Sequence, residues 1–197
     1  MRIRELGAAP YEVVLAEMKD FTRARTDATP DELWLVEHPP VYTLGQGAEP
    51  RVVASSIPVV RSDRGGDITY HGPGQVVLYA LVDLARRGIK VKRFVWLLEQ
   101  SVIELLAQFA VRGERWPGAP GVYIDGGKIA ALGIRVSRGR AYHGLSVNVD
   151  MDLSPFSAID PCGYPGLQIT QVKDLGIEVP DVKARLANRL IDLLAHE

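Results

Sequence analysis

Hydrophobic residues recur at helical spacing in three segments of the chain. The first follows Pro10, the second runs from Val91 to Phe109, and the third begins at about Asp181. Their apolar stripes comprise Tyr11, Val14, Leu15, Met18 and Phe21; then Val91, Phe94, Val95, Leu98, Val102, Leu105, Leu106 and Phe109; then Val182, Leu186, Leu190, Leu193 and Leu194. We expect each stripe to pack into the core, with polar residues on the opposite face of each helix.

Short runs of β-branched and aromatic residues, separated by Gly- and Pro-containing breaks, predict strands between these helices. The runs are Leu33–Val36, Val41–Leu44, Val59–Val60, Ile68–Tyr70, Val76–Val82, Val122–Ile124, Lys128–Val136 and Ala141–Val149. The strands come in groups and do not alternate strictly with helices, which argues against a doubly wound parallel sheet. The pattern predicts an α+β fold with a mixed or mainly antiparallel sheet, in a single domain over residues 1–197.

Composition narrows the classes of partner. The chain has 23 Lys and Arg against 24 Asp and Glu, a net charge of -1, which gives no electrostatic basis for binding nucleic acid. No run approaches the roughly 20 apolar residues of a membrane span. The first six residues lack the apolar core of a signal peptide, so we expect a cytoplasmic protein.

The most unusual stretch, Arg64 to Gln75, carries four glycines and a proline in 12 residues. Such a segment is either a plain hairpin or a place where a ligand approaches the backbone closely. The grouping of Arg64, His71 and Gln75 favours binding. The stretch lacks the Gly-Lys-Ser/Thr ending of a P-loop, so a phosphate cradle is not indicated.

A second stretch begins with the hairpin signal Asp125-Gly126-Gly127 and continues into an apolar strand that opens with Lys128. A lysine at a strand start is usually solvated. The alternative is a partly buried ammonium that lowers the pKa of a neighbouring acid. A third stretch, Tyr142 to Asp150, carries His143, which is either a hydrogen-bonded structural histidine or a residue that binds substrate or transfers a proton.

Cys162 is the single cysteine of the chain and lies between Pro161 and Gly163. Turn-forming neighbours place its thiol on a loop, where it can be inert or, with an activating group nearby, a nucleophile. The four histidines are widely spaced and the cysteine has no partner cysteine, so no metal site is predicted. No Gly-x-Ser-x-Gly elbow indicates a serine hydrolase.

Together these stretches resemble the lipoate-protein ligase B family, the octanoyl-acyl-carrier-protein:protein octanoyltransferases. The matching signatures follow one another in order across about residues 64 to 172. They are Arg64-Gly65-Gly66 through Tyr70-His71-Gly72-Pro73-Gly74-Gln75, Gly127-Lys128-Ile129-Ala130, His143-Gly144-Leu145 with Asn148, and Met151-Asp152-Leu153-Ser154-Pro155-Phe156 running to Pro161-Cys162-Gly163.

The resemblance implies a fold shared with lipoate and biotin ligases and a cytoplasmic role in making protein-bound lipoate. It implies that Cys162 is the acyl-thioester nucleophile and that Lys128 lowers its pKa. The substrate-binding residues it implies are Arg64, Gly65, Gly66, Asp67, Ile68, Thr69, Tyr70, His71, Ala131, Leu132, Gly133, His143, Gly144, Leu145 and Ser146. We expect the acyl tail beside the small residues Gly65, Gly66, Ala130, Ala131 and Gly133.

The implied donor is octanoyl-acyl carrier protein. The implied acceptors are lysines on the lipoyl domains of 2-oxoacid dehydrogenases and on the glycine cleavage H protein. Exchange of one thioester for another, followed by formation of a more stable amide, requires no ATP and no cofactor. Two alternatives stay open: an ATP-dependent lipoate or biotin ligase on the same fold, and a non-catalytic carrier-protein binding module in which Cys162 is incidental.

Overall fold

The computed structural model describes residues 1–49, 53–159 and 166–197. Its helices are α1 (Tyr11–Ala24), α2 (Leu84–Arg87), α3 (Val91–Ala107) and α4 (Val182–Ala195), with 3₁₀ turns η1 (Ser154–Ala158) and η3 (Val172–Leu175). Its strands are β1 (Arg2–Ala8), β2 (Glu32–Glu37), β3 (Val41–Leu44), β4 (Val59–Arg61), β5 (Ile68–His71), β6 (Gln75–Asp83), β7 (Glu114–Trp116), β8 (Ala119–Ile124), β9 (Gly127–Ser137) and β10 (Arg140–Asn148).

Within these ranges the strands form two sheets. The larger has seven strands in the order β1-β2-β6-β10-β9-β8-β7, and the smaller has three in the order β4-β3-β5. The β1–β2 and β3–β4 pairs are parallel and the other pairs are antiparallel. The predicted α+β class with a mixed, mainly antiparallel sheet is therefore confirmed.

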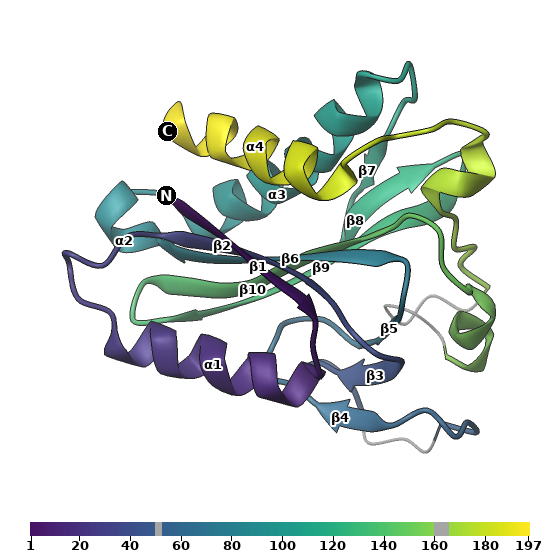
Figure 1. Cartoon of the computed structure of the whole chain (residues 1–197), viewed down its shortest axis with the longest axis horizontal. Helices are drawn as coiled ribbons and strands as arrows, with labels where there is room; N and C mark the ends of the chain where they lie inside the picture. The colour runs from purple at the N-terminus through teal and green to yellow at the C-terminus, as the bar shows by residue number, and fades with distance from the viewer. Residues whose placement is uncertain (50–52, 160–165) are drawn as a thin grey trace.

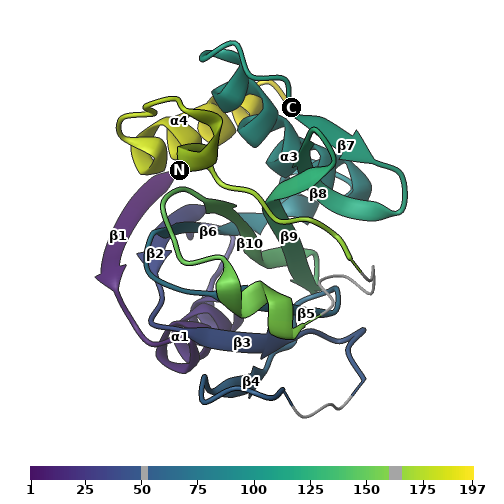
Figure 2. The ribbon, with the colours of Figure 1, turned by 90° about the vertical axis from the view of Figure 1, so that its right-hand side faces the viewer.

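The large sheet separates two apolar layers. α3 and α4 cover one face, whereas α1 and the small sheet lie on the other (Figure 1; Figure 2). Alternation along β6 explains how one strand serves both layers: Leu78 and Ala80 face the α3–α4 core, and Val77 and Leu81 face α1. β6 is buried along its whole length, as expected for a strand covered on both faces.

The three predicted helices form, with one correction at the start of the second. Val91, the first residue of its stripe, is 47% exposed and does not pack into the core, where packing of α3 begins at Phe94. β1 was not predicted. Its residues are exposed or half-buried, so Arg2–Ala8 carries no alternation of buried and exposed positions to reveal a strand.

A buried carboxylate joins three segments of the fold. Asp31 accepts from Arg25 Nη2 at 2.6 Å, from Arg86 Nη2 at 2.8 Å and from Arg87 Nε at 2.7 Å. It also accepts from the Asp83 backbone at 2.9 Å. Burial alone would raise the pKa of Asp31, but these hydrogen bonds and positive charges lower it. The cluster links the end of α1, the start of β2 and helix α2.

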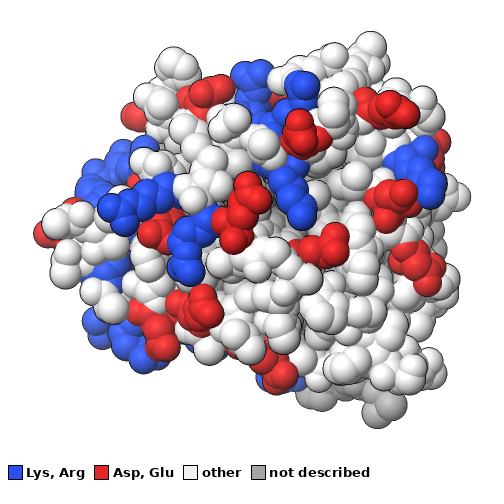
Figure 3. Space-filling model, viewed as in Figure 1, with Lys and Arg blue, Asp and Glu red and all other residues white. Residues whose placement is uncertain are grey.

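Charges of both signs are interspersed on the face seen in Figure 3, in agreement with the net charge of -1. Over the ranges that the structure describes, no helix has both the length and the apolar character of a membrane span.

Candidate active site

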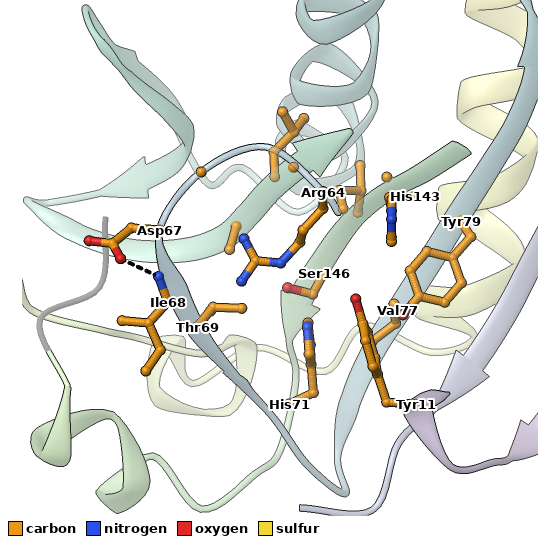
Figure 4. A pocket seen from close by; sticks show the side chains of 16 residues that line it. Tyr11, Arg64, Asp67, Ile68, Thr69, His71, Val77, Tyr79, His143 and Ser146 are labelled. Carbon is orange, nitrogen blue, oxygen red and sulfur yellow. Dashed lines mark hydrogen bonds between the residues drawn. The ribbon is translucent and has the colours of Figure 1, made fainter. Parts of the chain in front are cut away.

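A cavity lies between the large sheet and the segment that leads from Arg64 into β5 (Figure 4). The cavity is partly open to solvent. β6, β9 and β10 form its floor, and α1 closes one side with Tyr11. The lining residues are Tyr11, Arg64, Gly66, Asp67, Ile68, Thr69, His71, Val77, Tyr79, Ala131, Leu132, Gly133, His143, Gly144, Leu145 and Ser146.

The floor is a patch of small residues aligned by strand register. Ala131 pairs with Ser146, and Gly133 pairs with Gly144, across β9 and β10. A Cβ at Gly144 would lie 2.2 Å from the Leu78 carbonyl oxygen, so no larger residue fits there. Backbone packing therefore keeps this part of the floor free of larger side chains.

Arg64 holds the loop over this floor. Its guanidinium donates from Nη2 to Thr43 O at 2.6 Å and to Thr43 Oγ1 at 2.8 Å, and from Nη1 to Gly65 O at 2.9 Å. The loop is also joined to β9, because Gly65 N donates to Ile134 O at 2.9 Å. The buried positive charge of Arg64 helps to lower the pKa of His71 and His143 and opposes the rise in the pKa of Tyr11.

Three buried histidines gather at one side of the cavity, and burial is the main cause that lowers the pKa of each. His38 donates from Nδ1 to Ala9 O at 2.7 Å, since a carbonyl can only accept. Its Nε2 then accepts from the Tyr79 hydroxyl at 2.7 Å. The pKa of His71 falls to about 3, so its imidazole is neutral at physiological pH.

His143 is held in an unusual backbone conformation. Its φ of 62° lies in the left-handed region, which is uncommon for a non-glycine residue and clusters at functional sites. Its Nε2 donates to Asp63 Oδ1 at 2.9 Å, and Asp63 Oδ2 accepts from the Tyr142 hydroxyl at 2.6 Å. The Nδ1 atom of His143 is buried with no hydrogen-bond partner among the described residues. Asp63 therefore fixes which nitrogen of His143 carries the proton.

Lys128 is 2% exposed, so its interpretation as a solvated strand residue is wrong. Its Nζ donates to Pro120 O at 3.3 Å and lies 5.1 Å from the ring centroid of Tyr123. Gly121 makes room for it, because a Cβ there would lie 3.2 Å from Lys128 Cε. The structure thus keeps an ammonium inside the protein, where it acts on neighbouring groups more strongly than at the surface.

Residues 168–170, which follow Cys162 in the sequence, lie directly beside Lys128. Lys128 N donates to Gln168 O at 2.8 Å, and Thr170 N donates to Lys128 O at 3.0 Å. These two bonds make a parallel bridge between Lys128 and Ile169. Lys128 is therefore hydrogen-bonded through its backbone to a segment that begins six positions after Cys162 in the sequence.

A second hollow adjoins the cavity on the side of Lys128. It is lined by Gly65, Gly66, Asp67, Val95, Gly118, Ala119, Pro120, Leu132, Gly133 and Ile134. Four residues line both spaces, which are therefore adjacent: Gly66, Asp67, Leu132 and Gly133. The carbonyl that receives the Lys128 ammonium belongs to Pro120, in the wall of this hollow.

Comparison with known proteins decides the family. Residues 10–191 match the lipoyl protein ligase A/B catalytic domain. The chain belongs to this family. An octanoyltransferase of Aromatoleum aromaticum is 56% identical over 98% of this chain and 85% of the relative. An octanoyltransferase of Thiobacillus denitrificans is 59% identical over 89% of this chain and 81% of the relative. The resemblance to the lipoate-protein ligase B branch is thereby confirmed.

Solved structures support the fold of this lipoyl protein ligase A/B member. A lipoate-protein ligase A bound with ATP superposes with a TM-score of 0.75 at 16% identity, covering 99% of this chain and 84% of that one. Biotin protein ligase from Aquifex aeolicus gives a TM-score of 0.57 at 11% identity, covering 100% of this chain and 70% of that one. The predicted fold relationship to both ligase classes is confirmed.

The structure brings most of the predicted binding residues of this ligase-family chain into one cavity. Gly65 lines the adjoining hollow instead. Tyr70 does not line the cavity: it is 3% exposed, and its ring centroid lies 5.4 Å from that of Phe156 and 5.5 Å from that of Tyr42. Ala130, expected beside the acyl tail, instead faces the α3–α4 core. Cys162 lies outside the described residues.

Sequence reasoning missed three lining residues, Tyr11, Val77 and Tyr79. Tyr11 had been assigned to the core stripe of α1, and the two β6 residues to a buried strand. Alternation along β6 carried a signal, since Val77 and Tyr79 share the face on which the cavity lies. In the described part of the chain, no three His, Cys, Asp or Glu side chains are grouped to hold a metal ion.

Proposed function

We propose that this protein transfers an octanoyl group from octanoyl-acyl carrier protein to a lysine of a lipoyl domain, in the cytoplasm, through a thioester on Cys162. The acceptors are the lipoyl domains of 2-oxoacid dehydrogenases and the glycine cleavage H protein. The observation that carries the proposal is the buried ammonium of Lys128, which is 2% exposed. The backbone of the same residue is hydrogen-bonded to Gln168 and Thr170, shortly after Cys162 in the sequence. Family membership and a cavity floored by small residues support the acyl group.

In the first half-reaction, the thiolate of Cys162 attacks the carbonyl carbon of the donor thioester. A carbon–sulfur bond to Cys162 forms, the bond to the carrier thiol breaks, and the carrier leaves as a thiolate that takes up a proton. Lys128 favours the Cys162 thiolate, because an opposite charge nearby stabilises the ionised form of an acid. The acyl tail lies over Ala131, Gly133 and Gly144.

In the second half-reaction, the neutral amine of the acceptor lysine attacks the Cys162 thioester. A carbon–nitrogen bond forms, the carbon–sulfur bond breaks, and the proton released by the nitrogen returns to the sulfur. The products are an amide and the free thiol. An amide is more stable than a thioester, so the second step drives the transfer without ATP.

The test is intact-mass analysis after incubation with octanoyl-acyl carrier protein alone. We expect one octanoyl adduct on the wild-type chain, no adduct on Cys162→Ala, and loss of the adduct when a lipoyl domain is added. Circular dichroism controls for the fold of the variant. Full transfer activity of Cys162→Ala, or a requirement for ATP with free octanoate, would assign the protein to the adenylate-forming ligases instead. Absence of any adduct with unaltered carrier binding would favour a binding module.

A further inference from the structure

The peptide group between Pro120 and Gly121 lies between two buried charges of opposite sign. Its N–H donates to Glu99 Oε1 at 3.0 Å, and its carbonyl oxygen accepts from Lys128 Nζ at 3.3 Å. Glu99 is 8% exposed and Lys128 is 2% exposed. A carboxylate on α3 and an ammonium on β9 are therefore joined through one peptide group of β8.

The geometry of a trans peptide explains this arrangement. In the described part of the chain no peptide bond is cis, so the N–H and C=O of this group point in opposite directions. α3 packs against β8 and β9 (Figure 2), which brings the carboxylate to the N–H. Hydrogen bonds in a row polarise one another, and an ionised partner strengthens each of them. The carboxylate and the ammonium thus each strengthen the bond that the other makes.

Glycine is required at position 121 for this contact. The φ of Gly121 is 142°, and a Cβ there would lie 2.6 Å from Ala130 O and 3.2 Å from Lys128 Cε. The register of β8 against β9 also shifts between Val122 and Tyr123. The backbone of β8 therefore comes close to the lysine side chain, within reach of its ammonium.

Glu99 is itself held in place by Arg115. Its second oxygen, Oε2, accepts from Arg115 Nε at 2.9 Å, and Arg115 Nη2 donates to Gln100 Oε1 at 2.7 Å and to Trp96 O at 3.1 Å. The side chain of Arg115 is 29% exposed, so water screens its charge more than that of Glu99. Viewed from Lys128, the carboxylate is the nearer and less screened of the two charges.

The other elements around Lys128 contribute little negative charge among the described residues. Tyr123, on β8, presents its ring 5.1 Å from Nζ, and its hydroxyl donates to a backbone oxygen of the same strand at 3.0 Å. Residues 168–170, which run beside the Lys128 backbone, are uncharged. Asp125, in the turn before β9, is exposed and screened by water. Glu99 is therefore the buried carboxylate that the described contacts connect to Lys128.

We propose that Glu99 is a positioning residue: through this peptide group it keeps Lys128 protonated inside the protein and fixes the place of its ammonium. Burial favours the neutral amine, and a nearby carboxylate opposes this effect. The peptide carbonyl occupies one of the three N–H donors of the ammonium and so limits the directions of the others. This role rests on the proposed octanoyl transfer, in which Lys128 acts as a cation.

Substitution of the two partners of one ion pair separates this role from a general structural one. We expect Glu99→Gln to lower the pKa of Lys128 by about one pH unit, at the lower end of the effect of an opposite charge, because a peptide group lies between the two. Arg115→Gln removes a positive charge and should leave that pKa unchanged or higher. Loss of packing alone would change it in the same direction in both variants.

The ¹³Cε chemical shift of Lys128 against pH, assigned with Lys128→Met, measures this titration. A fall of similar size in Glu99→Gln and Arg115→Gln would overturn the proposal. So would a titration that is identical in Glu99→Gln and the wild type, or an ammonium that stays protonated through pH 11 in both. Circular dichroism checks the fold of each variant.

The Gly121 amide tests the positioning part of the role. Glu99→Gln keeps an oxygen that can accept from this amide, whereas Glu99→Ala removes the acceptor. We expect hydrogen exchange of the Gly121 amide to accelerate by about tenfold in Glu99→Ala, a typical effect of one lost hydrogen bond, and by less in Glu99→Gln. Unchanged exchange in Glu99→Ala would show that the peptide group is held without Glu99 and would overturn this part.

The transfer reaction supplies an independent readout. With Glu99→Gln, the rate of octanoyl transfer should fall at alkaline pH about one pH unit earlier than in the wild type, because Lys128 loses its proton earlier. Glu104→Gln is the matched control: this carboxylate is also on α3 but accepts from Gln100 Nε2 at 2.9 Å and lies 3.5 Å from Arg189 Nε.

Glu104→Gln should leave both the Lys128 titration and the pH profile unchanged, and a displacement as large as that in Glu99→Gln would overturn the proposal. If the wild-type protein forms no acyl adduct, the proposed function fails. The titration of Lys128 then still decides whether Glu99 holds the ammonium in its charged form.

Discussion

The carboxylate of Asp63 and the imidazole of His143 form a partly buried pair, with 2.9 Å between Oδ1 and Nε2. The pair joins the segment after β4 to the middle of β10. Asp63 also accepts from Tyr142 and lies 3.5 Å from Lys19 Nζ. Burial by itself would raise the pKa of Asp63, but its hydrogen bonds to His143 and Tyr142 and the positive charge of Lys19 hold that pKa well below the usual range.

Asp63→Asn should therefore change how stability depends on pH. A carboxyl whose folded pKa lies below its unfolded value contributes stability above about pH 4, and this contribution is lost as pH falls through the folded value. We expect a loss of about 1 kcal/mol at pH 7, since the side chain is 25% exposed, and a smaller difference below about pH 3.5. Urea unfolding at both pH values measures it; an equal difference at the two would contradict the pairing.

Lys128→Met should raise the pKa of the Cys162 thiol. An ammonium within about 4–6 Å lowers the pKa of a neighbouring acid by about 1–3 pH units, and methionine has a similar length without the charge. The rate of iodoacetamide alkylation against pH reports the thiolate. Lys173→Met is the control, because Lys173 is an exposed lysine bonded to Asp150 and should leave the profile unchanged. An unchanged profile in Lys128→Met would remove Lys128 from thiol activation.

Ala131→Leu should shorten the preferred acyl chain. Ala131 lines the cavity floor opposite Ser146, and three further carbon atoms there would occupy space assigned to the tail. We expect competition between hexanoyl, octanoyl and decanoyl donors to shift toward hexanoyl by at least about tenfold. Val136→Leu is the control. Val136 lies on the same strand but packs against the α3–α4 core, so the acyl-chain preference of this variant should match that of the wild type. If Ala131→Leu keeps the acyl-chain preference of the wild type, the tail does not bind beside Ala131.

Asp31→Asn should destabilise the fold without touching the cavity. Removing the charge leaves Arg25, with a side chain 0% exposed, without its buried counter-charge. Breaking such a pair costs about 3–5 kcal/mol. Chemical unfolding should show this loss at pH 7, and Asp20→Asn, in the exposed Asp20–Arg23 pair, should change stability by under about 1 kcal/mol. A small loss in Asp31→Asn would mean that water or a neighbouring group replaces the carboxylate.

Hydrophobic periodicity was sufficient to predict the three long helices and the central strands, because buried faces repeat in sequence, but it missed the single turn of α2. It missed β1 and β7, whose residues are mostly exposed at the two edges of the sheet. The burial of Lys128 could not be predicted from hydrophobic periodicity either. It depends on Gly121 and Pro120 in a neighbouring strand, and the residues near Lys128 are apolar whether it is solvated or buried.

The candidate site was predicted from ordered motifs, and the structure adds what motifs do not contain. His71 Nδ1 is hydrogen-bonded to Gln75, and Gln75 is oriented in turn by Asn148. Asn148 is held by the backbone oxygen of Thr170, far away in sequence. Tyr70 shows that membership of a motif does not guarantee a place in the cavity. It lies within a binding motif, yet its ring packs beside Phe156, and its backbone oxygen accepts a hydrogen bond from Gln75 Nε2.

The small-residue floor also sets which mutations can alter it. Gly144 has no space for a Cβ beside Leu78 O, and a Cβ at Gly133 would lie 2.8 Å from Gly65 O. Ala131 and Ser146 already carry side chains. The floor therefore has two positions that can change, Ala131 and Ser146, and two glycines that backbone packing holds constant. Selection of a new chain-length preference from a random library should return changes at Ala131 and Ser146 and retain both glycines.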